Sequence, residues 1–227
     1  MRRLLGLGLL SAGLAAGAHG QSVPAAPAAT LPPRAWALSA DFIPLLASGY
    51  HLSAERRIGQ SGRQTIVFTP QFYRGPVNDL TSARHEGATD RVRGFGLAAQ
   101  HRLYLGRQPE APLAGTYLAY GLVYQHFQMQ FQSFNWQQEV APDGLFYYEH
   151  RLRDQTEVIN RYGATVVVGQ QLEMPGSPFF LDFFLGLGLR QAFSRATLPN
   201  KQFATTLSDY GHAGAYLPIG CRIGLRL

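Results

Sequence analysis

The C-terminal segment 215–227, AYLPIGCRIGLRL, carries an apolar side chain at every second position. Its odd-numbered positions hold only Ala, Leu, Ile and Cys, whereas its even-numbered positions hold Tyr, Pro, Gly and Arg. Successive side chains of an extended strand point to opposite faces, so this two-residue period predicts a β-strand with one apolar and one polar face.

The same alternation runs through the chain, most clearly in 179–190, FFLDFFLGLGLR, and in 94–105, GFGLAAQHRLYL. Together these patterns predict eight strands, at 35–45, 49–58, 64–74, 94–105, 116–131, 157–172, 179–190 and 215–227. Strands of globular proteins usually have about 5–6 residues, whereas a tilted strand needs about 9–11 residues to cross a bilayer. The predicted strands are therefore long enough to span a membrane.

The composition indicates which face of these strands is buried. Only 15% of the residues are charged, although 46% are hydrophobic. A soluble barrel would expose polar faces made mainly of Gly, Ala, Phe and Tyr, which form a poor solvated surface. A membrane barrel instead turns the apolar faces to lipid and the polar faces to a narrow lumen. We therefore expect an all-β fold, an eight-stranded antiparallel up-and-down transmembrane β-barrel over 35–227.

Composition and motifs exclude several other classes. Cys221 is the only cysteine, so no disulfide forms within the chain. The formal charge of +6 comes with no basic run or aromatic-interleaved basic motif, so no nucleic-acid partner is predicted. No phosphate loop or dinucleotide fingerprint is present, and the loop histidines and carboxylates lack convergent spacing. No cofactor and no metal site is therefore predicted.

The N-terminal residues have the pattern of an export signal. Residues 1–20 combine two arginines, an apolar stretch and small residues before Gln21, which predicts a cleavable signal peptide. Residues 21–34, QSVPAAPAATLPPR, predict a flexible leader rich in Pro and Ala. We therefore expect a location in the bacterial outer membrane, in contact with its lipid.

The predicted connections alternate between short and long after the second strand. The short or moderate ones are 59–62, 106–115 and 173–177, and the long polar ones are 75–91, 132–156 and 194–213. Short periplasmic turns and long external loops are typical of outer-membrane barrels. We expect the long loops to lie outside the cell as candidate binding surfaces for an extracellular partner, with 132–156 forming an extended hairpin. A tight external turn is expected at 46–49.

Four segments resemble a known family. Segment 93–105 is similar to the "RGF…RYY" strand of small bacterial outer-membrane β-barrels of uncharacterised function, and 179–188 to their "FFLD…GLG" strand. Segment 51–56 resembles their "LGYER" strand, and 224–227, GLRL, resembles their last strand with leucine in place of the usual terminal aromatic. The resemblance implies an eight-stranded, OmpA/OmpX-like barrel in the outer membrane, with no known ligand or activity.

Charged side chains recur on the predicted luminal faces. They are Glu55, Arg57, Arg102, Arg161, Asp182, Arg190, Arg222 and Arg226. Buried charges are stable when they are paired, so we expect a network that fills the barrel. An anion-selective pore is the alternative, although eight strands leave an interior that side chains fill. The aromatic residues expected at the membrane interface are Trp36, Tyr50, Tyr104 and Tyr117.

His51, Ser53 and Glu55 occupy alternate positions of one predicted strand and share its face. A nucleophile, a base and a carboxylate are the parts of a hydrolase, so an outer-membrane lipid hydrolase, lipid A deacylase-like, is one alternative function. Residues two apart on a strand lie about 6–7 Å apart, however, which is longer than a hydrogen bond. A secreted lipocalin-like barrel that binds an apolar ligand is the other alternative. We expect a non-enzymatic barrel with a structural or surface-interaction role.

Overall fold

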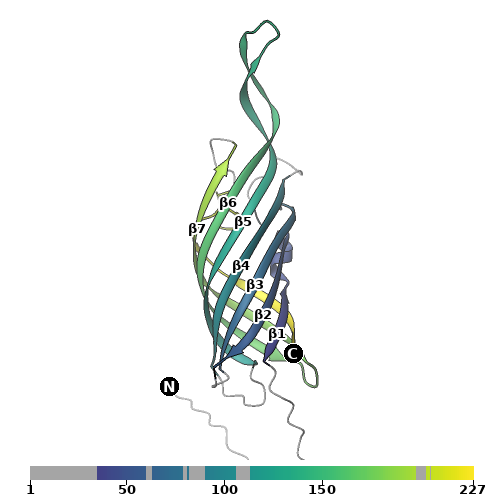
Figure 1. The fold of residues 1–227 in the computed structure, drawn as a ribbon, viewed down its shortest axis with the longest axis vertical. Coiled ribbons are helices and arrows are strands. Elements are labelled where there is room, and N and C mark those ends of the chain that lie inside the picture. Colours follow the sequence, from purple (N-terminus) through teal and green to yellow (C-terminus); the bar gives the residue numbers. More distant parts are fainter. Residues whose placement is uncertain are drawn as a thin grey trace, which may run out of the picture. The chain divides into compact units, whose positions relative to one another are not determined.

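The computed structural model describes residues 35–59, 63–78, 81, 90–105, 113–197, 203–204 and 206–227. The strands in these ranges are β1 (Trp36–Asp41), β2 (Gly49–Ile58), β3 (Gln64–Pro76), β4 (Arg91–Tyr104), β5 (Gly115–Val140), β6 (Phe146–Glu173), β7 (Phe179–Ala196), β8 (Gly214–Tyr216) and β9 (Ile219–Arg226). Consecutive strands from β1 to β7 pair antiparallel, β7 pairs with β8 and β9, and β9 returns to β1. Since β8 and β9 lie along the same neighbour in one register, the sheet closes in a ring of eight strands (Figure 1). The predicted all-β, eight-stranded up-and-down barrel is confirmed. The predicted signal peptide and leader at 1–34 lie outside the described residues.

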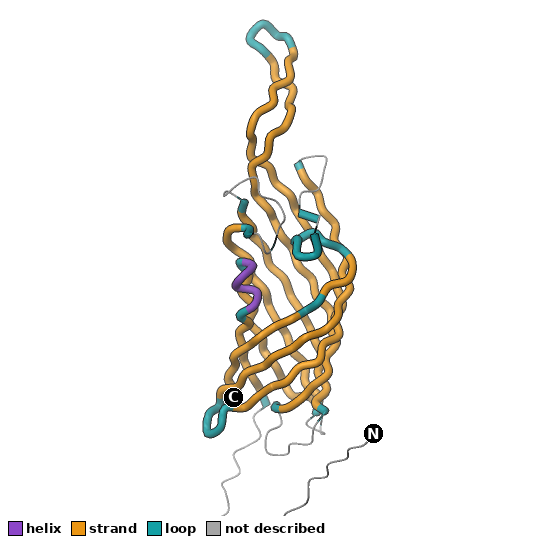
Figure 2. Tube along the Cα trace, turned by 180° about the vertical axis from the view of Figure 1, so that it is seen from behind, coloured by secondary structure: helices purple, strands orange, loops and turns teal. Residues whose placement is uncertain are grey.

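The first predicted strand, 35–45, was too long. β1 ends at Asp41, and the 3₁₀ helix η1 (Ile43–Ala47) leads into β2 (Figure 2). Pro44 favours this change, because proline lacks an N–H donor and its fixed φ suits the first turn of a helix. The Asp41 carboxylate accepts a hydrogen bond from the Ile43 N–H at 3.2 Å. This helix replaces the tight turn expected at 46–49.

The last predicted strand, 215–227, is interrupted at Leu217 and Pro218, which separate β8 from β9. Proline cannot donate a backbone hydrogen bond to the neighbouring strand. The register nevertheless continues across the gap, so the predicted alternation of faces is kept.

The predicted strands at 116–131 and 157–172 extend into a long hairpin. β5 and β6 have 26 and 28 residues and pair without a break from Gly115 opposite Gln171 to Val140 opposite Phe146. The turn between them is closed by the Ala141 N–H, which donates to the Leu145 carbonyl at 2.8 Å. Figure 1 shows this hairpin rising past the ends of the other strands, at the opposite end from the C-terminus. The expected extended hairpin is confirmed.

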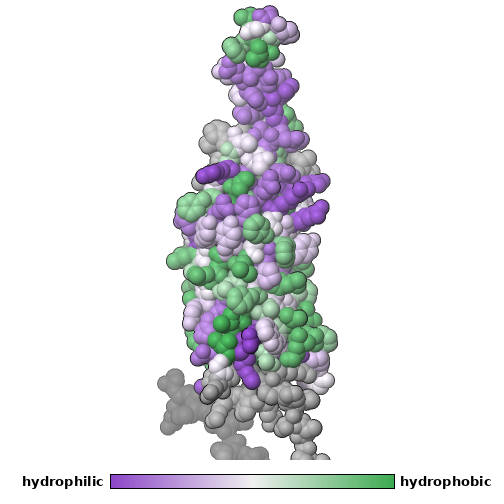
Figure 3. All heavy atoms as spheres, in the orientation of Figure 1, coloured by the Kyte–Doolittle hydropathy of each residue, from purple (hydrophilic) through white to green (hydrophobic). Residues whose placement is uncertain are grey.

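The barrel turns its apolar faces outward. On β3, Phe68 and Phe72 are 51% and 55% exposed, whereas Thr69 and Gln71 between and beside them are buried. The space-filling view shows apolar side chains over the barrel wall and hydrophilic side chains along the hairpin (Figure 3). No helix among the described residues is long and apolar enough to cross a membrane.

Two of the aromatic residues expected at a membrane interface lie inside the barrel instead. Tyr104 and Tyr117 are register partners and both are buried, whereas Trp36 and Tyr50 are exposed on the wall. Tyr104 is two residues after the buried Arg102, so it shares the inward face of β4. The interface expectation was wrong for both tyrosines.

Inside the barrel, bulky aromatic side chains lie opposite glycines. Register pairs that follow this rule include Phe127–Gly94, Tyr117–Gly169, Phe184–Gly220, Phe180–Gly224 and Tyr216–Gly188. A Cβ atom built at Gly220 would lie 2.0 Å from Phe184 Cζ, and one at Gly224 would lie 2.1 Å from Phe180 Cζ. Glycine at these positions therefore makes room for the aromatic rings that fill the narrow interior.

We expect Gly220→Val to lower the free energy of unfolding by about 1–3 kcal/mol, because the added side chain displaces the Phe184 ring from a filled interior. Urea unfolding in detergent micelles, followed by intrinsic fluorescence, measures this change. Cys221→Val is the matched control, since residue 221 lies on the opposite face of the same strand. Equal losses in the two variants would contradict the packing described for Gly220.

Candidate functional site

An ion-pair cluster lies inside the barrel between β1, β2, β4, β7 and β9. Arg102 Nη1 lies 3.1 Å from Glu55 Oε2, and Arg102 Nη2 lies 3.2 Å from Asp182 Oδ2. Arg222 extends the cluster, with Nη1 3.5 Å from Asp182 Oδ2 and Nε 3.5 Å from Asp41 Oδ2. All five residues are buried. The cluster therefore connects strands on opposite sides of the ring through paired charges.

Hydroxyl groups supply further hydrogen bonds to these carboxylates. Thr65 Oγ1 and the Tyr104 hydroxyl donate to Glu55 Oε1 at 2.6 and 2.8 Å. The Tyr117 hydroxyl donates to Asp182 Oδ1 at 2.7 Å. A buried ion pair is stable only when its remaining lone pairs are also satisfied. The tyrosines and the threonine meet this need for two of the three carboxylates.

Two more of the predicted luminal arginines lie nearer the hairpin end and are held by neutral oxygens. Arg161 donates to the Gln125 side chain at 2.7 Å and to the Tyr210 carbonyl at 3.1 Å. Arg190 donates to backbone carbonyls in the segment 206–213, at 2.8 and 3.0 Å. These arginines anchor the last long connection to the barrel wall.

The two remaining charged residues that were predicted to face the lumen are not part of the ion-pair cluster. Arg226 forms an ion pair with Glu173 at the C-terminal end of the barrel. Arg57 is on the inward face of β2 and has no ion pair or hydrogen bond with another described side chain. The structure joins Glu55, Arg102, Asp182 and Arg222, half of the predicted set, and adds Asp41.

Aromatic side chains pack against one another inside the barrel at the hairpin end. The rings of Phe127 and Tyr210 lie 4.9 Å apart, and those of Phe131 and Phe203 lie 5.3 Å apart. The Tyr210 hydroxyl donates to the Ala47 carbonyl at 2.7 Å, and burial raises the pKa of this hydroxyl to about 12. Part of the predicted external loop 194–213 therefore packs into the barrel, and its buried residues are not available to a partner.

The three residues of the candidate hydrolase face the lumen but do not contact one another. His51 Nε2 lies 2.7 Å from the Tyr73 hydroxyl, and Ser53 Oγ lies 2.8 Å from Thr69 Oγ1. Glu55 belongs to the ion-pair cluster. Each candidate thus has a different partner, and among the described residues no base hydrogen-bonds to the Ser53 hydroxyl.

The long hairpin exposes aromatic side chains beyond the barrel. Phe134, Trp136, Phe146 and Tyr148 are 62–68% exposed. The His150 ring lies 4.8 Å from Trp136 and 5.4 Å from Phe134, so these rings gather on one part of the hairpin. Exposed aromatic residues are common anchors at protein interfaces. The predicted external loop 75–91 lies largely outside the described residues.

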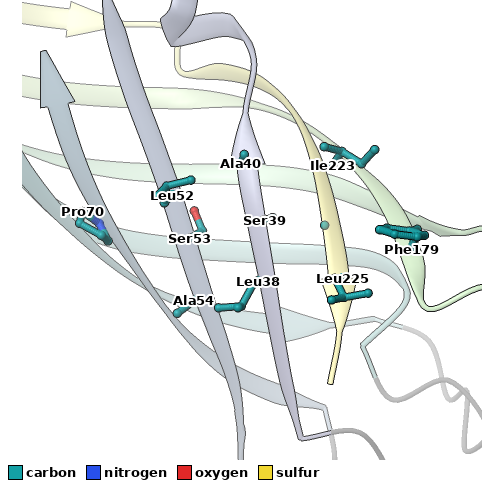
Figure 4. Close-up of a pocket in the computed structure, with 11 residues that line it drawn as sticks. Leu38, Ser39, Ala40, Leu52, Ser53, Ala54, Pro70, Phe179, Ile223 and Leu225 are labelled. Atoms are coloured by element: carbon teal, nitrogen blue, oxygen red, sulfur yellow. The ribbon is translucent and has the colours of Figure 1, made fainter. Parts of the chain in front are cut away.

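The outer wall carries a shallow apolar groove of about 510 Å³ around β1 (Figure 4). Leu38 and Ala40 of β1 lie at its centre, with Leu52 of β2 on one side and Ile223 and Leu225 of β9 on the other. The groove forms because Ala40 is small while its register neighbours are large. Ser39 and Ser53 also border it, but the surface that faces the groove is entirely apolar, so no hydroxyl there would hold a reacting substrate.

Several interior residues were missed at the sequence level. Asp41 lies within the first predicted strand, 35–45, whose alternation is weak, and only its odd-numbered position, shared with Ala37 and Ser39, marks the inward face of β1. Gln125 was missed because its partner Arg161 is 36 positions away in the chain. Strand register decides which residues of neighbouring strands lie opposite each other, and the hydrophobic pattern alone does not predict that register.

No family model, no curated protein and no solved structure matches this chain. The ring of eight antiparallel strands agrees with the fold that the family resemblance implied.

We expect Asp182→Ala to lower the free energy of unfolding by about 3–5 kcal/mol, because it leaves two buried guanidinium groups short of a partner. Urea unfolding in micelles, read from the heat-modifiable band on a gel, measures the loss. The control is Glu149→Ala on the hairpin, whose ion pairs with Arg151 and Arg153 are partly exposed and contribute at most about 1 kcal/mol. A loss for Asp182→Ala no larger than that of the control would show that the cluster does not stabilise the barrel.

Proposed function

We propose that the protein is a non-enzymatic barrel of the bacterial outer membrane that holds an aromatic hairpin outside the cell for contact with a partner. The observation that carries this proposal is the outward apolar wall of a closed ring of strands. Leu122, Leu187 and Leu189, on β5 and β7, are 68–69% exposed. Soluble monomers rarely expose apolar patches larger than a few hundred Å². A bilayer covers such a wall, and a closed barrel leaves no unpaired strand edge in lipid.

The filled interior supports a structural role over transport. Arg102 and Arg222 form ion pairs with the Asp182 carboxylate inside the lumen. Phe127, Tyr210 and Phe203 pack together at the hairpin end. An eight-stranded barrel has room for side chains or one small ligand, and here side chains occupy the described lumen. The same filling disfavours a lipocalin-like carrier, because an apolar ligand would meet buried charges.

The lipid hydrolase has weaker support than the non-enzymatic barrel. A hydrolase needs a base oriented toward its nucleophile, and a substrate that reaches both. Ser53 is 4% exposed and shares its hydrogen bond with Thr69, while His51 is bound to Tyr73. Ser53 borders the apolar groove on the outer wall, but its hydroxyl is bonded to the buried Thr69 and does not face that groove.

The hairpin is the part of the barrel best suited to meet a partner. Its two strands are paired to the turn, so the aromatic residues are held on a preorganised support rather than on a flexible loop. Preorganisation lowers the entropic cost of binding. We therefore expect recognition to involve the exposed rings of Trp136, Phe146 and Tyr148.

Cysteine labelling on whole cells tests the location and the orientation together. In a Cys221→Ser background, we expect the Asp143→Cys variant to react with a membrane-impermeant maleimide on intact cells. The Ser177→Cys variant is its matched control, because both positions lie in hairpin turns whose side chains accept a backbone hydrogen bond two residues later. We expect residue 177 to react only after the outer membrane is opened.

Two results would overturn the proposal. Equal labelling of both positions on intact cells would contradict the orientation. Recovery of the chain in the soluble periplasmic fraction, without a heat-modifiable band, would contradict membrane insertion.

A further inference from the structure

Two arginines face each other on the outer wall. Arg74 of β3 and Arg93 of β4 are direct register partners, and both are exposed on the outward face. Arg91 is two residues before Arg93 and shares that face. Within the described part of the chain, none of the three has an ion pair or a side-chain hydrogen bond. The neighbouring outward residues on β5, opposite Arg93 and Arg91, are the neutral Gln128 and Gln130.

Repulsion between Arg74 and Arg93 destabilises the folded barrel unless an anion binds between the two guanidinium groups. Like charges directly opposite each other on adjacent strands are destabilising, and their Cβ atoms lie about 4.5–5.5 Å apart. That spacing lets two guanidinium groups converge on one anion. Guanidinium groups match phosphate oxygens in bidentate geometry, which makes arginine well suited to a phosphate ligand.

Apolar side chains continue directly below the arginines on the same wall. Phe72 follows Arg74 toward the C-terminal end of the barrel, and Phe95 and Leu97 follow Arg93. Phe72 and Phe95 are themselves register partners, and the three apolar side chains are 50–55% exposed. On the face shown in Figure 3, hydrophilic side chains lie above the apolar part of the wall. Cationic groups above an apolar surface match an amphiphile with a phosphate head group and acyl chains.

We infer that Arg74 and Arg93, with Arg91 beside them, bind the phosphate of an anionic membrane lipid whose acyl chains lie against Phe72, Phe95 and Leu97. The inference rests on the proposed function, because it requires the wall to be in a bilayer. It adds a specific lipid contact at the hairpin end of the apolar wall, in the leaflet on that side. The bound phosphate supplies a counter-charge that none of the described residues provides there.

Thermal unfolding in two kinds of vesicle tests the inference. The full chain is inserted into phosphatidylcholine vesicles with and without phosphatidylglycerol, and the loss of the folded band on gels gives the midpoint. A lipid that binds only the folded state raises the midpoint. We expect phosphatidylglycerol to raise it by roughly 2–4 °C for the unchanged chain. This rise is lost in the R74Q/R93Q variant.

The matched control is R63Q/R195Q, which removes the same number of charges from two exposed arginines. Arg195 lies opposite Val158 rather than opposite another arginine, and Arg63 precedes β3. We expect the control to keep the full rise. In phosphatidylcholine alone, R74Q/R93Q should unfold at an equal or higher midpoint than the unchanged chain, because the repulsion is relieved. An unchanged or raised midpoint in phosphatidylcholine alone distinguishes the loss of a lipid contact from general damage to the fold, which would lower the midpoint.

Three outcomes overturn the inference while leaving membrane insertion intact. They are an unchanged midpoint on adding phosphatidylglycerol, an equal loss of the rise in both double variants, and the same rise with inorganic phosphate in phosphatidylcholine vesicles. The last would assign the site to a free anion. Failure of the unchanged chain to insert into either vesicle overturns the proposed function and this inference together.

Discussion

Closure of the sheet by β1 and β9 is the constraint on which the rest of the structure depends. Five consecutive register pairs, from Ala37 opposite Arg226 to Asp41 opposite Arg222, join the first strand to the last. Closure pairs the first strand with the last, so the free edges of the sheet are reduced to short segments such as β8, which pairs only with β7. It also fixes a narrow interior, into which every second side chain must fit. The crowding of the interior follows from this one pairing, and the alternation of side chains along each strand then places the apolar residues outside.

The interior accommodates this crowding in two ways. Charges are paired across the lumen, as where Asp182 lies between Arg102 and Arg222. Bulky rings lie opposite glycine, as where Phe184 covers Gly220. The low charged fraction of the chain is consistent with this arrangement, because the outward half of each wall strand is largely apolar and the inward half has space for few charged side chains.

The sequence predicted the strands well and their contacts poorly. Two-residue alternation is a local signal, so it located the strands and assigned Glu55, Arg102 and Asp182 to one face. This signal did not predict the end of β1 before Pro44 or the break between β8 and β9 at Pro218, because a proline has no N–H group to pair with the neighbouring strand. Contacts such as Arg102 with Glu55, 47 residues apart, depend on register and barrel closure. For the same reason the spacing of His51 and Ser53 suggested a hydrolase, whereas residues of other strands take up their hydrogen bonds.

The central claim is that the apolar wall lies in lipid while the hairpin stands in water, and the two tryptophans of the chain report on these two surfaces. Trp36 is exposed on the barrel wall and Trp136 on the hairpin. The direct measurement is fluorescence quenching by lipids with brominated acyl chains, with Trp136→Phe reporting Trp36 and Trp36→Phe reporting Trp136. The account predicts strong quenching of Trp36 and none of Trp136. Unquenched fluorescence from Trp36 in folded, vesicle-bound protein would contradict it.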